Sequence, residues 1–144
     1  MQTANSGTLA DPVLYEEIQA FYARHMQLID EGSLTAWAAT FTEDAVISNN
    51  VNPRPAEGRP AIAAVIHRAH GELASKGIQQ RHWMGMLTVE PVDGENVRAR
   101  SYALILNTAA GGAPAVERST VCHDELSLVG GAWQIRRRRV HHDG

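Results

Sequence analysis

Val121-Cys122-His123-Asp124-Glu125-Leu126-Ser127-Leu128 has the pattern of a β-strand with a carboxylate among apolar residues. Because side chains of a β-strand alternate between two faces, Asp124 shares a face with Leu126 and Leu128. A second stretch, Arg81-His82-Trp83-Met84-Gly85-Met86-Leu87, puts His82 on one face with Met84 and Met86 in the same way. Both polar groups then point into an apolar interior, where an unpaired carboxylate or imidazole is costly. We therefore expect His82 and Asp124 either to satisfy each other or to line a cavity that does chemistry.

Four long strands joined by short turns are expected around these two residues, over residues 78–92, 96–107, 115–128 and 132–141. Before them, helical spacing predicts helices over residues 11–30, with Asp11 as the N-cap, over 34–41 and over 60–75, and a short strand over 45–48. The turn-rich residues 49–58 are expected to form a short hairpin or a lid. Helices followed by a meander of long strands indicate an α+β fold, in which a cone-shaped, curved antiparallel sheet packs against N-terminal helices.

The 144 residues fit one domain over residues 11–144, preceded by a flexible tail at 1–10. The tail lacks the segments of a signal peptide, and no apolar stretch reaches the roughly 20 residues needed to span a bilayer. Cys122 is the single cysteine and fits a reducing compartment, so we expect a cytoplasmic protein without a membrane partner. A formal net charge of -3 argues against a nucleic-acid partner.

Helices laid across the concave side of such a sheet leave a conical pocket between the two layers. The spacing of large residues on the first helix turns Tyr22 and His25 toward this pocket, and Trp37 lies on the apolar side of the second helix. Met84 and Met86, on the face of His82, suit a flexible aromatic or polyketide substrate.

The run Arg136-Arg137-Arg138-Arg139 continues the last strand. Strand alternation counted from Trp133 and Ile135 on the core face predicts that Arg137 and Arg139 lie near the inner mouth of the pocket. The same alternation puts Arg136 and Arg138 outside.

Short motifs follow one another along nearly the whole chain at compatible spacing: residues 23–32, Phe41-Thr42-Glu43-Asp44-Ala45-Val46, Gly58-Arg59-Pro60-Ala61-Ile62, Arg81-His82, His123-Asp124-Glu125-Leu126, and Trp133-Gln134-Ile135 with Arg139. Together they resemble the SnoaL-like polyketide cyclase and dehydratase branch of the nuclear transport factor two-like superfamily. The resemblance implies its cystatin-like α+β barrel. This fold also hosts isomerases, epoxide hydrolases and non-catalytic binders.

Other branches of the superfamily fit the chain differently. A ketosteroid isomerase has an aspartate base after its first strand, and its oxyanion hole consists of a tyrosine on the first helix and an acid on a late strand. The corresponding residues here are Asn49, His25 and Val121, and none of them is of the required type. The small subunit of aromatic-ring dioxygenases is similar in its arginine-histidine pair and late aspartate, and it implies a largely structural domain. An epoxide hydrolase would activate water on Asp124 and needs a second carboxylate and an arginine, for which Asp30 and Arg139 are the candidates.

Residues and resemblance together indicate general acid-base catalysis on a polyketide-like or aromatic carbonyl substrate. His82 would be the acid and base, and Asp124 would either orient it or act as the base itself. Tyr22 or His25 would hydrogen-bond the substrate carbonyl, and Arg139 would balance the charge of Asp124.

The substrate-binding set also includes Trp37, Asn49, Met84 and Met86. We expect the reaction to need no cofactor. We also expect no metal, because His67 and His70 on the third helix lack a third ligand. A homodimer through the exposed face of the sheet is expected. A non-catalytic subunit or ligand-binding module that uses the same pocket is the open alternative.

Overall fold

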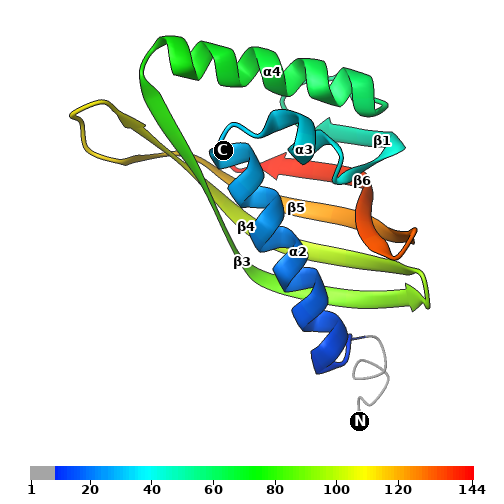
Figure 1. Ribbon diagram of the computed structural model, residues 1–144. Coiled ribbons are helices and arrows are strands. Elements are labelled where there is room, and N and C mark those ends of the chain that lie inside the picture. The colour runs from blue at the N-terminus through cyan, green and yellow to red at the C-terminus, as the bar shows by residue number, and fades with distance from the viewer. Residues whose placement is uncertain (1–8) are drawn as a thin grey trace.

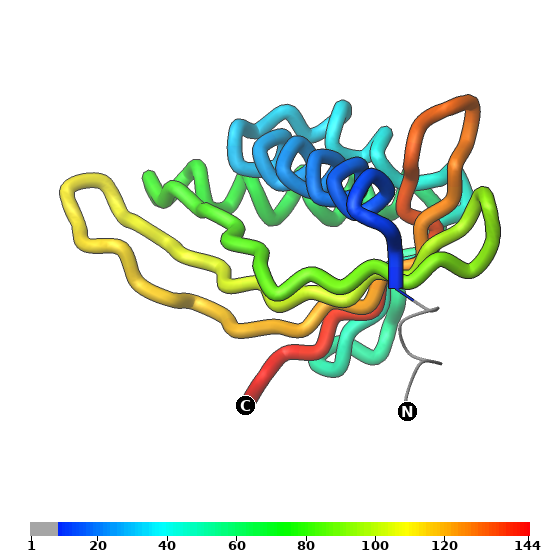
Figure 2. Tube along the Cα trace, turned by 90° about the horizontal axis from the view of Figure 1, so that it is seen from below, coloured from blue at the N-terminus to red at the C-terminus, as the bar shows by residue number. Residues whose placement is uncertain are grey.

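The computed structural model describes residues 9–144, and it arranges them as a helical layer over one face of a single curved sheet (Figures 1 and 2). The elements follow the chain in the order α2 (Pro12–Asp30), α3 (Leu34–Ala38), β1 (Phe41–Asn49), β2 (Ala56–Glu57), α4 (Arg59–Ser75), β3 (Ile78–Asp93), β4 (Asn96–Ala109), β5 (Ala115–Val129) and β6 (Ala132–His142). The six strands lie in the order β2-β1-β6-β5-β4-β3. The expected α+β fold is confirmed. Most of the expected tail at 1–10 lies outside the described residues.

Helix α2 begins where the sequence predicts it. The Asp11 side chain accepts a hydrogen bond from the backbone N–H of Leu14 at 2.9 Å, and Pro12 occupies the first turn. One face of the helix is buried against the sheet and includes Ile18, Tyr22 and His25. None of the helices within residues 9–144 is both long and apolar enough to cross a membrane.

The second helix is shorter than expected. It ends at Ala38, and Phe41, which was expected in the helix, begins strand β1 instead. Phe41 is fully buried and pairs with Ile135 of β6, and the N–H of Ile135 donates to the Thr40 carbonyl at 2.9 Å. This parallel pairing with a strand almost a hundred residues away overrides the local helical pattern, and no short window of sequence contains it.

The turn-rich segment after β1 forms a hairpin. Strand β2 pairs antiparallel with β1, with Ala56 opposite Ile47 and Glu57 opposite Val46. Of the two expected alternatives for residues 49–58, the hairpin is therefore the one that forms.

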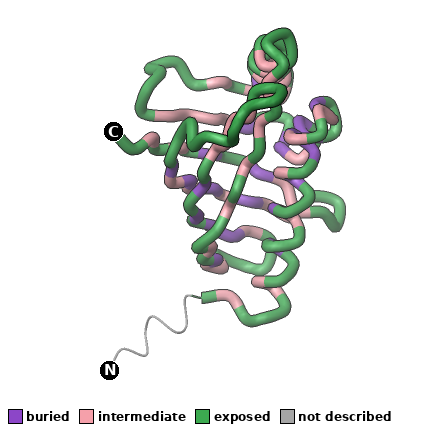
Figure 3. The backbone as a smooth tube through the Cα atoms, turned by 90° about the vertical axis from the view of Figure 1, so that its left-hand side faces the viewer, coloured by how far each residue is buried: buried purple, intermediate pink, exposed green. Residues whose placement is uncertain are grey.

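The four long strands agree with their expected bounds to within about two residues, and β3 to β6 form the antiparallel meander. The sheet curves so that the helices cover its concave side, and the β4–β5 hairpin projects beyond the helical layer (Figure 2). Buried positions alternate with exposed ones along the strands (Figure 3). The core consists of the inward face of the sheet and the buried faces of α2 and α3.

Two bulges interrupt this alternation and change which side chains face inward. In β3, the register shifts between Gly85 and Thr88, and Met86 has a φ of 52°. As a result Met86 is 78% exposed, so its expected position on the inner face is wrong.

The second bulge lies in β6. Leu126 pairs with Ile135, but the preceding Glu125 pairs with Arg137, which leaves Arg136 as an extra residue. Beyond the bulge, Arg138 is buried whereas Arg137 and Arg139 are exposed. The prediction from simple alternation is therefore correct for Arg136, which is exposed, and wrong for Arg137, Arg138 and Arg139, because the inserted residue shifts every position after it.

Candidate active site

A cavity of about 240 Å³ lies between the helices and the inner face of the sheet. Its walls are largely apolar and come from α2, α3, α4 and the sheet, with Met26, Ile29, Ile66 and Ile105 among them. Polar side chains enter it from β1, β3, β5 and β6: Asn49, His82, Arg118, Thr120, Arg138 and His142. A mostly apolar cavity with few polar groups is typical of a small-molecule site.

Asp124 lies next to this cavity, but both of its carboxylate oxygens already accept hydrogen bonds from other side chains. Arg138 Nε donates to Oδ1 at 3.0 Å and Nη2 donates to Oδ2 at 3.0 Å, and the Tyr22 hydroxyl donates to Oδ2 at 2.6 Å. The Asp124 side chain is 1% exposed. Three donors, two of them from one guanidinium, make this a fully satisfied buried carboxylate.

The electrostatics of this cluster keep each group in one protonation state. Burial, followed by the charge of Asp124, raises the pKa of the Tyr22 hydroxyl well above its ordinary value, so Tyr22 stays a neutral donor. Burial alone would lower the pKa of Arg138, but the adjacent Asp124 carboxylate outweighs burial and raises it. Arg138 is therefore a permanent cation.

Arg138 presents part of its guanidinium to the cavity. Its Nε and Nη2 atoms are bound to Asp124, and the group lies over the Phe41 ring at 5.4 Å from the ring centroid. No hydrogen bond within residues 9–144 uses Nη1, and Arg138 is among the residues that line the cavity. This leaves one charge-bearing donor for a ligand.

His82 is held by Asp30, the last residue of α2. The imidazole Nδ1 lies 2.7 Å from Asp30 Oδ1, and the backbone N–H of His82 donates to Oδ2 at 3.1 Å. Because an ionised carboxylate only accepts hydrogen bonds, Nδ1 carries the proton and the neutral ring has its free lone pair on Nε2. His82 lines the cavity, and Nε2 makes no hydrogen bond within the described residues.

Of the two alternatives expected for His82 and Asp124, the direct pairing is wrong. His82 on β3 lies opposite Ile105 on β4, whereas Asp124 on β5 lies opposite Ala99, which in turn pairs with Val89 of β3. The two residues therefore occupy different cross-strand rows, even though both face inward as expected. Each has its own partner, and the two partners come from other elements.

Tyr22 and His25 are buried, and they do not line the cavity. Tyr22 binds Asp124, and His25 is fully buried between the rings of Phe21 and Trp37. Because the Thr40 hydroxyl donates to the Trp37 carbonyl at 2.6 Å, His25 Nδ1 must be the donor in its 2.7 Å bond to Thr40 Oγ1. The expectation that His25 contacts a substrate carbonyl is wrong, because its ring is enclosed by the core.

Of the remaining expected residues, Trp37 and Asn49 line the cavity. The Asn49 side-chain oxygen accepts from the backbone N–H groups of Val51 and Asn52, at 2.9 and 2.7 Å, so it also shapes the hairpin. Met84 borders a groove between α2 and β3, outside the cavity. Met86 lies in the same groove and on the outer face of the sheet.

Arg139 lies on the outer face of the sheet, in a hollow shared with Arg100, His123 and Arg137. It therefore does not balance the charge of Asp124, which Arg138 does. The two residues suggested for epoxide opening, Asp30 and Arg139, lie on opposite sides of the sheet and are not assembled into one site.

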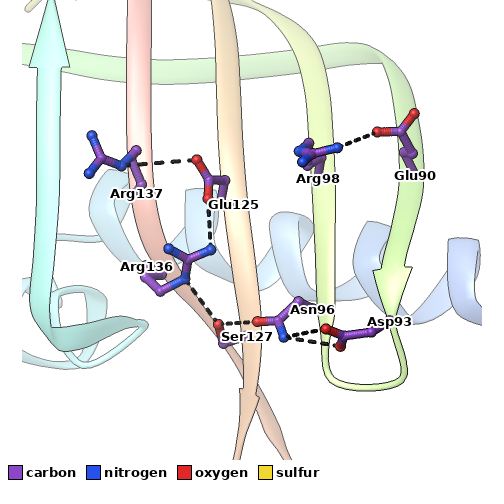
Figure 4. Close-up of polar contacts among 8 residues, drawn as sticks. All are labelled: Glu90, Asp93, Asn96, Arg98, Glu125, Ser127, Arg136 and Arg137. Atoms are coloured by element: carbon purple, nitrogen blue, oxygen red, sulfur yellow. Dashed lines mark hydrogen bonds and ion pairs between the residues drawn. The ribbon is translucent and has the colours of Figure 1, made fainter.

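Figure 4 shows how the β6 bulge leaves two consecutive arginines on the outer face, where the helices lie behind the strands. Arg136 Nη2 lies 2.7 Å from Glu125 Oε1, and Arg137 Nε lies 3.9 Å from Glu125 Oε2. Arg136 and Arg137 thus share one acceptor, as expected when two residues oppose one. These pairs are exposed to solvent and contribute little to stability.

Sequence reasoning missed the roles of Asp30 and Arg138. Asp30 could have been found, because it follows Tyr22 and Met26 at steps of four along α2 and so lies on the same helical face. Arg138 could not, because a bulge is not visible in a run of four identical residues. No group of three or more potential metal ligands lies together within residues 9–144.

The architecture is that of nuclear transport factor two-like proteins with a cystatin-like fold. The sequence profile of the SnoaL-like domain matches residues 13–139, and the chain belongs to this family. No curated protein matches the chain.

Three solved structures illustrate the relationship. Aln2 from a Streptomyces species is 36% identical, with 94% of each chain covered and a TM-score of 0.86. ActVI-ORFA from Streptomyces coelicolor is 33% identical over 90% of this chain and 97% of its own, with a TM-score of 0.83. A protein from Catenulispora acidiphila, solved in complex with S-DNPA, is 32% identical over 92% of this chain and 96% of its own, with a TM-score of 0.80.

Proposed function

We propose that this protein is a cofactor-independent cyclase or dehydratase acting on a polyketide-like or aromatic carbonyl substrate. The observation that carries the proposal is that His82 and Arg138 line one apolar cavity, and that neither His82 Nε2 nor Arg138 Nη1 makes a hydrogen bond within residues 9–144. A base and a fixed cation are the two groups needed to form and stabilise an enolate. The complex of the Catenulispora acidiphila relative with S-DNPA supports a small-molecule site in this fold.

His82 would act as the base. Its Nε2 takes a proton from the carbon next to a substrate carbonyl, and the electron pair of that C–H bond forms the enolate. Asp30 favours this step, because it fixes the tautomer and stabilises the imidazolium that results.

Arg138 would stabilise the enolate oxygen through Nη1. The enolate carbon then attacks a second carbonyl carbon to form the new C–C bond, and the alkoxide takes the proton back from His82. In dehydration, His82 removes a further proton next to the carbonyl and delivers it to the leaving hydroxyl, which departs as water. Asp124 and Tyr22 are positioning residues in this scheme, because they hold Arg138 and have no free access to substrate.

We also propose that the protein is a homodimer and works in the cytoplasm. The buried, unpaired Cys122 thiol is compatible with a reducing compartment. The outer face of the sheet bears the exposed apolar side chains that support the dimer.

The test uses 4-hydroxy-4-(2-naphthyl)butan-2-one, a β-hydroxy ketone that gains a conjugated double bond when it loses water. We expect the protein to accelerate the rise in enone absorbance and His82→Ala to lower kcat by about 10²-fold to 10⁴-fold, the usual contribution of a general base. Asp30→Asn should lower kcat less and leave KM nearly unchanged, because the base remains but its tautomer is no longer held.

His67→Ala is the matched control, because His67 lies exposed on α4 and, among the described residues, its ring bonds only to the Ala63 carbonyl of its own helix. Retained activity in His82→Ala would refute the assignment of the base. Binding of the ketone without any turnover would identify the protein as a ligand-binding module instead.

A further inference from the structure

The cavity has a cation at its open end that the reaction scheme does not use. Alternate side chains of β5 face inward: Arg118, Thr120, Cys122 and Asp124. Arg118 and Asp124 therefore lie at opposite ends of this series. Both Arg118 and His142 line the cavity, and His142 pairs with Thr120 across β5 and β6. Arg118 and His142 are thus diagonal neighbours on one face of the sheet.

This end of the cavity carries the positive charge of Arg118. None of the ion pairs within residues 9–144 includes Arg118. The neighbouring carboxylate of Asp143 accepts a hydrogen bond from Ser119 at 2.7 Å, and both border the hollow on the outer face. The pKa of His142 is lowered by burial and then by the charge of Arg118, against a smaller opposing effect of Asp143, so the field of the arginine reaches the imidazole.

His142 is held in place by its backbone. Its N–H donates to the Asn50 side-chain oxygen at 2.7 Å, and its carbonyl accepts from the Asn50 amide at 3.0 Å. The position of the imidazole at the cavity is therefore tied to the hairpin after β1.

The register relates this cation to the reacting groups. His82 on β3, Ile105 on β4 and Arg118 on β5 form one cross-strand row. With adjacent strands about 4.8 Å apart, the Cα atoms of His82 and Arg118 are about 10 Å apart. A flat molecule of two fused rings spans a distance of this order.

We infer that Arg118, together with His142, binds a carboxylate of the substrate at the mouth of the cavity while the carbonyl at its other end lies between His82 and Arg138. The inference rests on the proposed function for the location of the reacting carbonyl, and it names the substrate class as an aromatic keto acid. The Arg118 guanidinium and one imidazole N–H of His142 are hydrogen-bond donors, so each oxygen of a carboxylate would have a donor.

Equilibrium binding of 6-acetyl-2-naphthoate and of the neutral 6-acetyl-2-naphthamide, measured by calorimetry, tests the inference without requiring turnover. The two probes have the same shape and differ in the charged end. We expect the carboxylate to bind at least about 10-fold more tightly than the amide, and Arg118→Gln to remove this difference while leaving the affinity for the amide unchanged. Arg118→Lys should keep a large part of the preference, because it keeps the charge.

Arg139→Gln is the matched control, since it removes the same charge from the outer face of the adjacent strand. Equal affinity for the two probes in the native protein would overturn the inference. Failure to bind the carboxylate at all, or an equal loss in Arg139→Gln, would also overturn it. If the carboxylate preference depends on Arg118 but the naphthyl hydroxy ketone is not dehydrated, the anion site stands and the proposed reaction fails.

Discussion

At the scale of single residues, the buried titratable groups have separate tasks. Asp124 holds Arg138 and thereby orients the cation of the site, whereas Asp30 holds His82 and thereby sets its tautomer. His25 belongs to neither pair. It is enclosed by aromatic rings, and its Nε2 has no hydrogen-bond partner within the described residues, so a second proton on the ring would be left without an acceptor.

Burial of His25 has a consequence for stability that depends on pH. Burial, followed by the charges of Arg138 and His82, lowers its pKa well below the ordinary value. The unfolded chain then binds a proton below about pH 6.5 that the folded chain does not, so stability falls as the pH drops from 6.5 toward the folded pKa. Between pH 7.5 and 5.5, we expect His25 to reduce the free energy of unfolding by on the order of 1 kcal/mol, measured by urea denaturation.

The His25→Phe variant should lose the contribution of His25 to the pH dependence of stability. If the larger phenylalanine ring does not fit the core, the His25→Gln variant provides the same test. His67→Gln is the control, because His67 is exposed. The same fall in stability in His25→Phe as in the native protein would show that other groups cause it.

At the scale of elements, a single bulge in β6 decides which arginine belongs to the site. Because Arg136 is the extra residue, Arg138 faces inward, and both Arg137 and Arg139 face solvent. We expect Arg138→Gln to leave the Asp124 charge buried without its partner and to lower the free energy of unfolding by about 3–5 kcal/mol.

The same substitution at Arg137 or Arg139 should change stability by less than about 0.5 kcal/mol, because both side chains are exposed. Denaturant unfolding of the three variants side by side gives the comparison. A large loss for Arg137→Gln or Arg139→Gln, with Arg138→Gln unaffected, would mean that β6 follows simple alternation without the bulge.

At the scale of the whole molecule, the sheet has one face covered by helices and one face open. Trp83 is 68% exposed there and pairs with Leu104 across β3 and β4, with Tyr102 and Val121 beside them. A hollow of about 600 Å³ on this face has a largely apolar lining. Contiguous exposed apolar side chains favour association with another surface, and a second copy of the chain supplies a matching one.

We therefore expect a dimer in sedimentation experiments at micromolar concentration, and we expect Trp83→Glu to convert it to a monomer. Val13→Glu is the control, because Val13 is an equally exposed apolar residue on α2. A monomeric native protein, or dimers that persist in Trp83→Glu, would contradict this arrangement.

Local patterns in the sequence correctly predict the N-cap of α2, the bounds of the long strands and the inward orientation of His82 and Asp124. These features depend on capping and on local periodicity, which short stretches of chain contain. The partners of His82 and Asp124, in contrast, depend on how distant segments pack together. Strand register separates His82 from Asp124, the end of α2 brings Asp30 to His82, and the bulge at Arg136 brings Arg138 to Asp124. Register and bulges arise from contacts between distant segments that pack together, so no local pattern contains them.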